Sequence, residues 1–173
     1  KVDYAMRALL ELAASETADP NRLVTGEHLA QAQKIPPRFL EAILRQLRQA
    51  QIVTSRRGAE GGYRLARPAA EITVAEVVRS LDGPLAAVRG DRPEHAAYTG
   101  PAARLQDVWV ATRTALRDVL DHVTLADIER VRRIEGWGVA GADVERRLPG
   151  EPTLSEATQA VYRSYAEARG KSR

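Results

Sequence analysis

The sequence predicts a mainly α-helical fold with one small β-hairpin, and three observations support this prediction. Apolar residues recur at helical spacing in residues 2–15 and again in residues 37–49. Between residues 55 and 67, glycines and arginines separate two short alternating runs, which is typical of a hairpin. A third apolar rhythm, at every third or fourth position of residues 102–121, predicts a long helix after the hairpin.

Composition restricts the class of protein before any motif is considered. The 173 residues are 44% hydrophobic and 28% charged, which is ordinary for a soluble globular domain, and no apolar run reaches the roughly 18–20 residues of a membrane span. The chain has no cysteine, which excludes disulfides, thiolate metal ligands and thiol nucleophiles. Its start contains acids and is unlike a secretory signal. We expect a cytoplasmic protein whose initiator Met and a few neighbours precede Lys1.

Positive charge is concentrated in one segment of the chain. Residues 34–67 contain eight Lys or Arg and two Glu, a net charge of +6, whereas the rest of the chain has a net charge of −3. Basic charge gathered in this way is typical of a protein with a polyanion partner. A solvated basic face without a partner explains the charge alone equally well.

Residues 25–49 predict two short helices joined by a tight turn. Thr25 is the expected N-cap of the first helix, and Pro37 fits the first turn of the second, where a missing N–H costs nothing. The predicted buried face of the second helix consists of Phe39, Leu40, Ile43, Leu44 and Leu47, and its polar face of Arg38, Glu41, Arg45 and Arg48. Such a pair matches a helix-turn-helix, although helical hairpins are common.

The arginine–glycine stretch directly follows the second helix. Residues 52–53 predict one strand, and residues 63–65 alternate like a second strand. A helix-turn-helix followed by a basic hairpin is a winged helix, and its wing would extend from Arg56 to Gly62. Nucleotide binding by these glycines is disfavoured, because no Lys follows them and the next residues predict a strand where a phosphate loop opens a helix.

The second half of the chain predicts further helices. Thr73 is the expected cap of one helix, which the sequence Asp-Gly-Pro ends, and residues 86–101 mix Gly, Pro and charge without periodicity. We divide the chain into a winged helix-turn-helix domain of residues 1–85, a loop of residues 86–101, a long helix within residues 102–128 and an extension of residues 129–173 with a final helix. The long helix either caps its own domain or pairs with a second copy, and we favour pairing.

Four segments resemble the Rrf-type family of winged helix-turn-helix transcriptional regulators, the group that contains IscR, NsrR and CymR. They are KVDYAMRALLELA, IPPRFLEAILRQLRQAQIVTSRRGAEGGYRLARP, EITVAEVVRSLDGPL and VWVATRTALRDVLDHVTLADI, and the resemblance extends over residues 1–128. The family implies a homodimeric transcription factor whose long helices pair. Its second helix enters the major groove of double-stranded DNA, and its wing touches the minor groove. By position, Arg38 and Glu41 match residues that face bases, and Arg57 matches the wing arginine.

Two sets of candidate site residues follow. For DNA binding we expect Thr25, Pro37, Arg38, Glu41, Arg45, Arg48, Arg56, Arg57, Gly58, Gly61, Gly62 and Tyr63; for dimerisation we expect Leu105, Val108, Trp109, Leu116, Val119 and Leu120. The guanidinium group of an arginine can donate two hydrogen bonds to guanine, and a carboxylate can accept a hydrogen bond from cytosine N4. Glycines allow the backbone of a wing to approach DNA closely. Three alternatives stay open: Arg38 and Arg45 contact only phosphates, Glu41 pairs along its own helix, and Tyr63 packs within the protein.

The chain departs from the iron–sulfur members of the family it resembles. Those members have three cysteines in the loop before the long helix, and Ala103 stands at the last of these positions. Gln106 stands where one member has a histidine ligand, and Asp3 where one has a carboxylate ligand. We therefore expect no iron–sulfur cluster, no other metal and no cofactor. By analogy with the CymR type, the resemblance suggests a role in sulfur or cysteine metabolism.

Two functions remain in competition. The first is a sequence-specific repressor or activator that binds a palindromic operator as a homodimer. The second is a regulator that acts mainly by holding a partner protein or small metabolite through residues 86–101 and the C-terminal tail. The sequence does not support an enzyme. It has no cluster of carboxylates and no Ser and His residues arranged as in a nucleophilic catalytic site, and its three histidines are dispersed. No membrane partner is expected.

Overall fold

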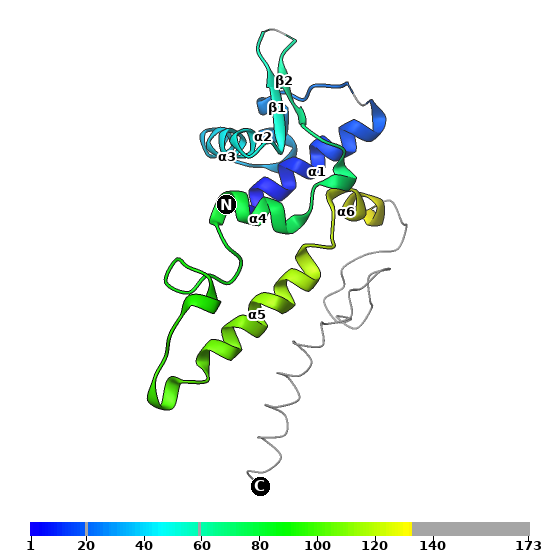
Figure 1. The fold of residues 1–173 in the computed structure, drawn as a ribbon. Coiled ribbons are helices and arrows are strands. Elements are labelled where there is room, and N and C mark those ends of the chain that lie inside the picture. Colours follow the sequence, from blue (N-terminus) through cyan, green and yellow to red (C-terminus); the bar gives the residue numbers. More distant parts are fainter. Residues whose placement is uncertain (20, 59, 133–173) are drawn as a thin grey trace. The chain divides into compact units, whose positions relative to one another are not determined.

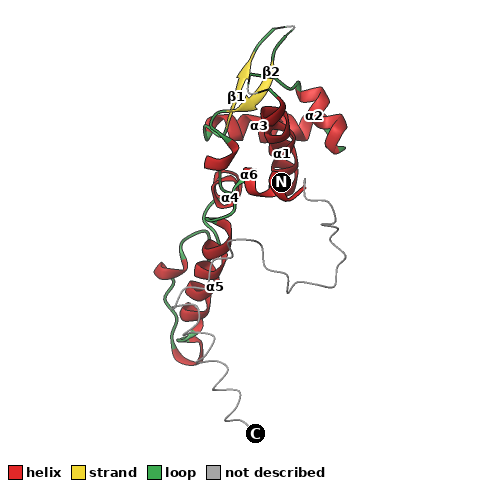
Figure 2. Cartoon of the chain, turned by 90° about the vertical axis from the view of Figure 1, so that its right-hand side faces the viewer, coloured by secondary structure: helices red, strands yellow, loops and turns green. Residues whose placement is uncertain are grey.

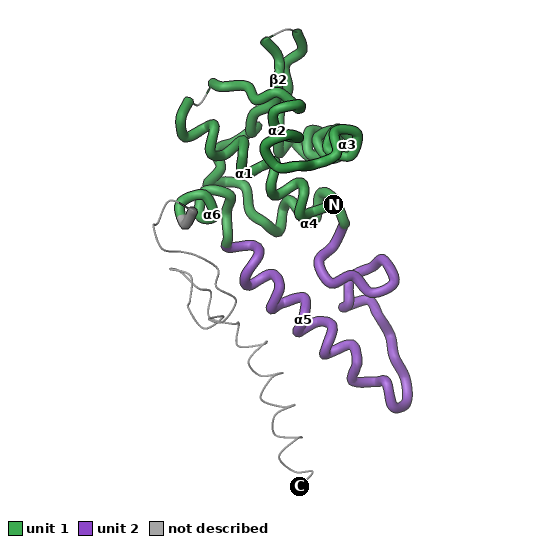
Figure 3. Tube along the Cα trace, turned by 180° about the vertical axis from the view of Figure 1, so that it is seen from behind, with its two compact units in different colours: residues 1–82, 123–139 green, residues 83–122, 140–173 purple. Residues whose placement is uncertain are grey.

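The computed structural model describes residues 1–19, 21–58 and 60–132 (Figure 1). These residues are mostly helical, with a two-stranded hairpin (Figure 2). They form two compact units, of which the first contains residues 1–82 and 123–132 and the second residues 83–122 (Figure 3). The final helix expected within residues 129–173 lies beyond the described residues. Within the described part of the chain, no helix is long and apolar enough to cross a membrane.

Helices of the first unit enclose its hydrophobic core. They are α1 (Val2–Ala18), α2 (Gly26–Gln33), α3 (Pro37–Gln49), α4 (Val74–Asp82) and α6 (Leu125–Arg132). Every one of these helices contributes to this core or flanks it, and Leu9, Leu29, Leu44, Val77 and Leu125 are each at most 1% exposed. Burying one such side chain stabilises the folded state by roughly 1.5–3 kcal/mol. The unit is therefore a helical bundle that positions the turn between α2 and α3.

The hairpin consists of β1 (Val53–Arg56) and β2 (Gly62–Leu65). The two strands are antiparallel, with Val53 opposite Leu65 and Arg56 opposite Gly62. Val53 and Leu65 are buried at the base of the hairpin, whereas Arg56 is exposed at its far end. A short 3-10 turn, η1 (Ala69–Glu71), then leads to α4. The prediction of a mainly helical fold with one small hairpin is confirmed.

The chain does not continue as one helix through residues 102–128. α5 (Leu105–Leu120) ends, and α6 begins only at Leu125. Thr124 causes the break: its hydroxyl accepts a hydrogen bond from the N–H of Asp127 at 3.1 Å, while the Asp127 carboxylate accepts from the N–H of Thr124 at 3.0 Å. This reciprocal capping satisfies two N–H groups that a helix start leaves unpaired. The apolar rhythm of residues 102–121 predicted α5, and this cap begins a second helix within the segment of residues 102–128.

Backbone hydrogen bonds attach the start of α6 to the first unit. The N–H of Leu125 donates to the carbonyl of Ile72 at 3.0 Å, and the N–H of Val74 donates to the carbonyl of Val123 at 2.9 Å. Leu125 is fully buried, and α6 packs against α1. A segment that follows α5 in sequence is thus part of the helical bundle.

In the second unit, α5 follows a segment with two short 3-10 turns. These are η2 (Pro93–His95), which lies within the predicted loop of residues 86–101, and η3 (Gly100–Ala102), which crosses its end. η2 packs against α5, and Pro93 is buried. The segment is therefore partly ordered by contact with the helix that follows it.

Candidate nucleic-acid interface

Local sequence determines the turn between α2 and α3. As predicted, the hydroxyl of Thr25 caps α2 by accepting a hydrogen bond from the N–H of His28 at 3.2 Å. Lys34 follows α2 with a φ of 52°, a left-handed conformation that ends the helix. Ile35 is 3% exposed and anchors the turn in the core, and Pro37 is the first residue of α3, as predicted. The direction of α3 is therefore set by a cap, an apolar anchor and a proline.

α3 has a buried face and an exposed polar face. Its buried residues are Leu40, Ile43, Leu44 and Leu47, and its predicted DNA-binding residues Pro37, Arg38, Glu41, Arg45 and Arg48 are all exposed. The charged residues are spaced three or four apart, which places them along one side of the helix. Among the described residues, Arg38, Glu41 and Arg45 form no ion pair or hydrogen bond with one another. The pairing of Glu41 with a neighbouring arginine, considered from the sequence, is not formed.

Phe39 does not belong to the buried face, contrary to the prediction. Its side chain is 43% exposed, and its ring meets that of Tyr4 edge-on at a centroid distance of 5.6 Å. Successive helix residues are separated by about 100°, so Phe39 lies on the flank of the stripe formed by Leu40, Ile43 and Leu47. The buried stripe is therefore narrower than the apolar pattern indicated.

The wing brings two arginines to the end of the hairpin. Arg56 and Arg57 are exposed, and neither guanidinium group has a hydrogen-bond partner among the described residues. Gly58 has a φ of 113°, a conformation that L side chains rarely adopt, and its carbonyl accepts from the N–H of Gly61 at 2.9 Å. This turn brings the chain back into β2 while both guanidinium groups stay available to a ligand.

Gly61 and Gly62 are required by the protein's own backbone. A Cβ at Gly62 would lie 2.7 Å from the carbonyl oxygen of Val24, and one at Gly61 would lie 2.8 Å from that of Gly58. Gly62 is crowded because Tyr63 pairs with Val24 through two backbone hydrogen bonds, of 2.8 and 2.9 Å. The Tyr63 side chain is half-buried against the core. These glycines therefore have a reason to be present that does not depend on DNA.

A side-chain hydrogen bond joins α3 to the wing. Arg48 Nη1 donates to the hydroxyl of Ser55 in β1 at 3.3 Å. Figure 1 shows α2, α3 and the hairpin together in one part of the first unit. Ser55 was not among the site residues predicted from the sequence, because this hydrogen bond depends on the packing of a strand against a helix. The exposed arginines of α3 and the wing thus belong to one connected structural element.

α5 exposes apolar side chains in the second unit. None of its residues is fully buried, and Trp109, Leu116 and Val119 are 36%, 39% and 44% exposed. Leu105, Val108 and Leu120, the other predicted dimerisation residues, are half-buried. A helix of 16 residues that buries none of them completely has an apolar face available for a partner.

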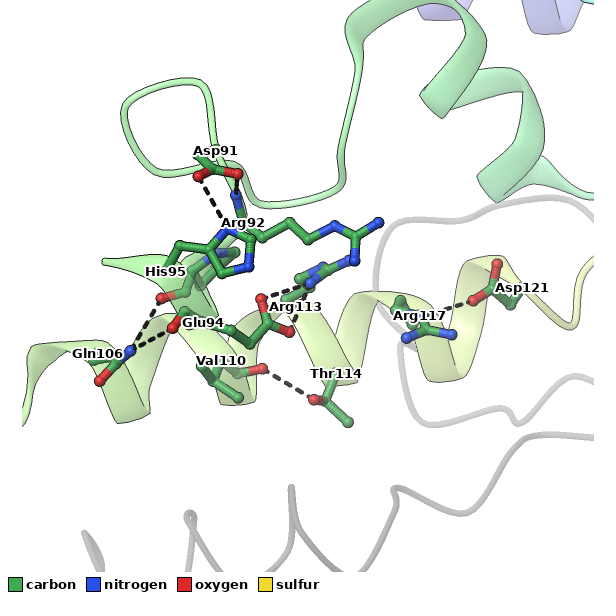
Figure 4. Close-up of polar contacts among 11 residues, drawn as sticks. Asp91, Arg92, Glu94, His95, Gln106, Val110, Arg113, Thr114, Arg117 and Asp121 are labelled. Atoms are coloured by element: carbon green, nitrogen blue, oxygen red, sulfur yellow. Dashed lines mark hydrogen bonds and ion pairs between the residues drawn. The ribbon is translucent and has the colours of Figure 1, made fainter. Parts of the chain in front are cut away.

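Polar contacts hold η2 against α5 (Figure 4). Arg113 Nη1 lies 2.6 Å from both carboxylate oxygens of Glu94, and the amide of Gln106 donates to the Glu94 carbonyl at 2.9 Å. The pKa of Glu94 is lowered, first by its own backbone N–H and then by Arg113. Asp91 lies 3.0 Å from His95, and its pKa is lowered first by the N–H of Arg92 and then by His95. Gln106 thus has a structural partner in η2.

The residues do not fit an iron–sulfur cluster. The sequence has no cysteine, and within the described residues no three His, Cys, Asp or Glu side chains gather as metal ligands would. Ala103 follows η3 and offers no ligand atom, and Asp3 forms an ion pair with Arg7 at 3.5 Å. The described residues therefore offer no set of side chains that fits such a cluster.

A helix-turn-helix with unpaired charged residues on its second helix, followed by a basic hairpin, defines the class of winged-helix DNA-binding proteins. Residues 1–130 match the Rrf2 family, described as iron-dependent transcriptional regulators. The chain belongs to the Rrf2 family. That description names iron, whereas this chain has no cysteine to hold an iron–sulfur cluster.

Relatives and solved structures agree with this assignment. The HTH-type transcriptional regulator Rv1287 of Mycobacterium tuberculosis is 50% identical over 132 residues, which are 74% of this chain and 78% of the relative. CymR of Bacillus subtilis is 34% identical over 72% of this chain and 83% of its own. The solved structure of B. subtilis CymR matches with a TM-score of 0.62 and 31% sequence identity, and the match covers 75% of this chain and 92% of that one. The structure of T. potens IscR matches with a TM-score of 0.61 and 27% identity, and the match covers 76% of this chain and 84% of that one. The chain is therefore a transcriptional regulator and not an enzyme.

Proposed function

We propose that this regulator binds a palindromic operator as a homodimer in the cytoplasm, with α3 in the major groove, the wing in the minor groove and no iron–sulfur cluster. The observation that carries the proposal is the exposed stripe of Arg38, Glu41 and Arg45, which have no partner among the described residues. A stripe of this kind on the second helix of a helix-turn-helix is positioned to meet base edges.

Individual residues then have distinct tasks. Arg38 donates to guanine and Glu41 accepts from cytosine N4, so both contribute to base recognition. Arg45 and Arg48 contact phosphates, which positions the helix. Arg57 enters the minor groove, where narrow A·T-rich segments have an enhanced negative potential. Thr25, Pro37, Arg56, Gly58, Gly61, Gly62 and Tyr63 complete the proposed interface.

Dimerisation is proposed through α5. Its exposed apolar residues Trp109, Leu116 and Val119 lie three or seven positions apart, so that they recur on one side of the helix. Pairing of two such helices removes this apolar area from water. A dimer also explains how one short helix reads an operator, because two copies read two half-sites related by the same two-fold axis.

A role in sulfur or cysteine metabolism is supported by analogy. The solved structure of B. subtilis CymR is titled as that of a global cysteine regulator, and that protein is 34% identical to this chain. The sequence has no cysteine, so the thiolate ligands of an iron–sulfur sensor are absent. We therefore propose a signal from a small molecule or a partner protein.

The alternative is a regulator that acts mainly through a partner held by residues 86–101 and the tail. A gel-shift titration with promoter DNA from the neighbourhood of its own gene separates the two functions. We expect a preference over competitor DNA that persists as salt rises from about 50 to 200 mM, while non-specific binding falls steeply. Binding without preference for any of these promoters would contradict the proposal and favour the alternative.

A further inference from the structure

The first turns of α1 contact both helices of the helix-turn-helix. Arg7 of α1 donates to the backbone carbonyl of Gln33, the last residue of α2, and its Nε donates to the Gln33 side-chain carbonyl at 3.3 Å. Tyr4, in the preceding turn of α1, meets the ring of Phe39 in α3 edge-on at a centroid distance of 5.6 Å. The same short stretch of α1 therefore holds the end of one helix and the beginning of the next.

Arg7 completes the C-terminal end of α2. The last carbonyl groups of a helix have no partner within that helix, and the helix dipole favours positive charge beside them. The Arg7 guanidinium supplies both a donor and a charge at Gln33, and Asp3 holds it from another side through an ion pair of 3.5 Å. The NH₂ group of Gln33 in turn donates to Glu11 at 2.8 Å. Two residues of α1, one helical turn apart, thus fix the last residue of α2.

Stacked side chains extend this constraint to α3. The Cζ atom of Arg7 lies 5.4 Å from the centroid of the Tyr4 ring, a distance at which a guanidinium group is attracted to an aromatic face. The Tyr4 and Phe39 rings are inclined by 80°, which is the favourable edge-to-face arrangement. Phe39 is 43% exposed, so burial in the core holds it only in part, and the Tyr4 ring supplies a further constraint. Arg7, Tyr4 and Phe39 therefore form a chain of contacts from the end of α2 to the first turn of α3.

We propose that Arg7 is a positioning residue for operator binding, which fixes the direction of α3 without touching DNA; this inference rests on the proposed function. The turn between Gln33 and Phe39 is held at both ends by the same group of α1 side chains. Arg38, a proposed base contact, directly precedes Phe39, and Glu41 follows it within one helical turn. A shift at the start of α3 displaces both side chains from base edges, and a hydrogen bond weakens steeply once its geometry is lost.

Two other roles of Arg7 make different predictions. If Arg7 only stabilised the fold, its loss would lower the free energy of unfolding and leave the operator affinity of the folded chain unchanged. If Arg7 contacted a phosphate, its loss would lower the affinity and also reduce the salt slope by about one. A positioning role instead predicts lower operator affinity at an unchanged salt slope, together with a change at the start of α3 in the DNA-free protein.

The experiment compares Arg7→Gln with Glu16→Ala in the full chain. Glu16 is the matched control, because its carboxylate accepts from the N–H of Ala69 at 3.2 Å and its loss removes a polar contact of α1 that involves neither α2 nor α3. Gel shifts at several salt concentrations are made where urea denaturation shows each variant to be folded. We expect about tenfold weaker operator binding in Arg7→Gln at the same salt slope, and a change within about twofold in Glu16→Ala. The backbone amide NMR shifts of Ile35 and Arg38 in the DNA-free chain should change only in Arg7→Gln.

Two further variants sharpen the test. Arg7→Lys keeps the charge and one donor for the Gln33 carbonyl, so it should bind operator more tightly than Arg7→Gln. Tyr4→Leu interrupts the same chain of contacts while Arg7 still completes α2, and it keeps the test decisive if Arg7→Gln fails to fold. We expect Tyr4→Leu to weaken operator binding by about fivefold at an unchanged salt slope.

Three results would overturn the inference. They are operator affinity that is unchanged in the folded Arg7→Gln and Tyr4→Leu variants, a salt slope reduced by about one in Arg7→Gln, and an unchanged Arg38 amide shift in the DNA-free Arg7→Gln chain. The last measurement involves no DNA, so it tests the inference independently of any operator. Failure of the unmodified chain to prefer any promoter would instead contradict the proposed function.

Discussion

The guanidinium group of Arg48 donates a hydrogen bond of 3.3 Å to the hydroxyl of Ser55, and so ties the last turn of α3 to the first strand of the wing. Arg48 thereby has two tasks in the proposed interface, because it also presents positive charge on the exposed face of α3. In the proposed complex, a helix and a wing joined in this way would approach the two grooves of DNA as one element. The two tasks can be separated by substitution.

Ser55→Ala removes the hydroxyl acceptor and leaves the charge of Arg48 intact. We expect operator affinity to fall by about 0.5–1.5 kcal/mol, because the wing is less firmly positioned, while the salt dependence of binding stays unchanged. Arg48→Gln should also lower the salt slope by about one, since a phosphate contact is lost. Gel shifts at several salt concentrations measure both quantities. Ser80→Ala, which removes a hydroxyl within α4, is the control.

Arg57→Ala tests the wing directly. Arg57 is exposed and has no partner among the described residues, so its loss should leave folding intact. We expect a loss of about 1–3 kcal/mol in operator affinity, if the side chain makes a specific contact. Arg104→Ala removes the same charge from the second unit and serves as the control. Equal operator affinity in Arg57→Ala and the unmodified chain would remove the wing arginine from the interface.

Much of the winged helix could be predicted because its signals are local. Thr25 caps α2, Pro37 opens α3, and the hydroxyl of Thr73 accepts from the N–H of Glu76 at the start of α4. Each of these features depends on residues within one helical turn. The hairpin could likewise be predicted without knowledge of the core, from the alternation of apolar and polar residues and from the glycines between the two strands.

Other features depend on contacts between distant residues and could not be predicted in the same way. The ring contact of Phe39 with Tyr4 joins residues 35 positions apart, and the contact of Glu94 with Arg113 joins residues 19 positions apart. The break before α6 is different, because the capping pattern Thr-Leu-Ala-Asp was present in the sequence. This capping pattern was overlooked because the apolar rhythm before it continues through Val123. For the candidate site, exposed residues could be selected from the sequence, but the Arg48–Ser55 hydrogen bond could not.

Leu116→Glu tests the proposed pairing of α5. Leu116 is 39% exposed, so the substitution should not damage a core, yet it places charge in the centre of the proposed dimer contact. We expect the mass measured by light scattering during size-exclusion chromatography to fall from that of a dimer to that of a monomer. Operator affinity should fall with it. Leu116→Met keeps an apolar side chain and should remain dimeric; a dimeric Leu116→Glu variant would argue against this helix as the contact.

The capping pair at the start of α6 makes stability depend on pH in a predictable way. The pKa of Asp127 lies below its ordinary value of 3.8, first because the Thr124 hydroxyl donates to its carboxylate at 2.7 Å and then because the Thr124 N–H does so. A lowered pKa means that this contribution is fully present above about pH 3.8 and is lost as the pH falls through the folded-state value. Thr124→Ala should lower the free energy of unfolding by about 0.5–2 kcal/mol at neutral pH, measured by urea denaturation, whereas Thr124→Ser should not. The difference between the unmodified chain and Thr124→Ala should narrow below pH 3.8, because protonated Asp127 no longer attracts its donors. A difference that stayed constant down to the lowest pH at which the chain is folded would show that the Asp127 carboxylate adds nothing to the cap.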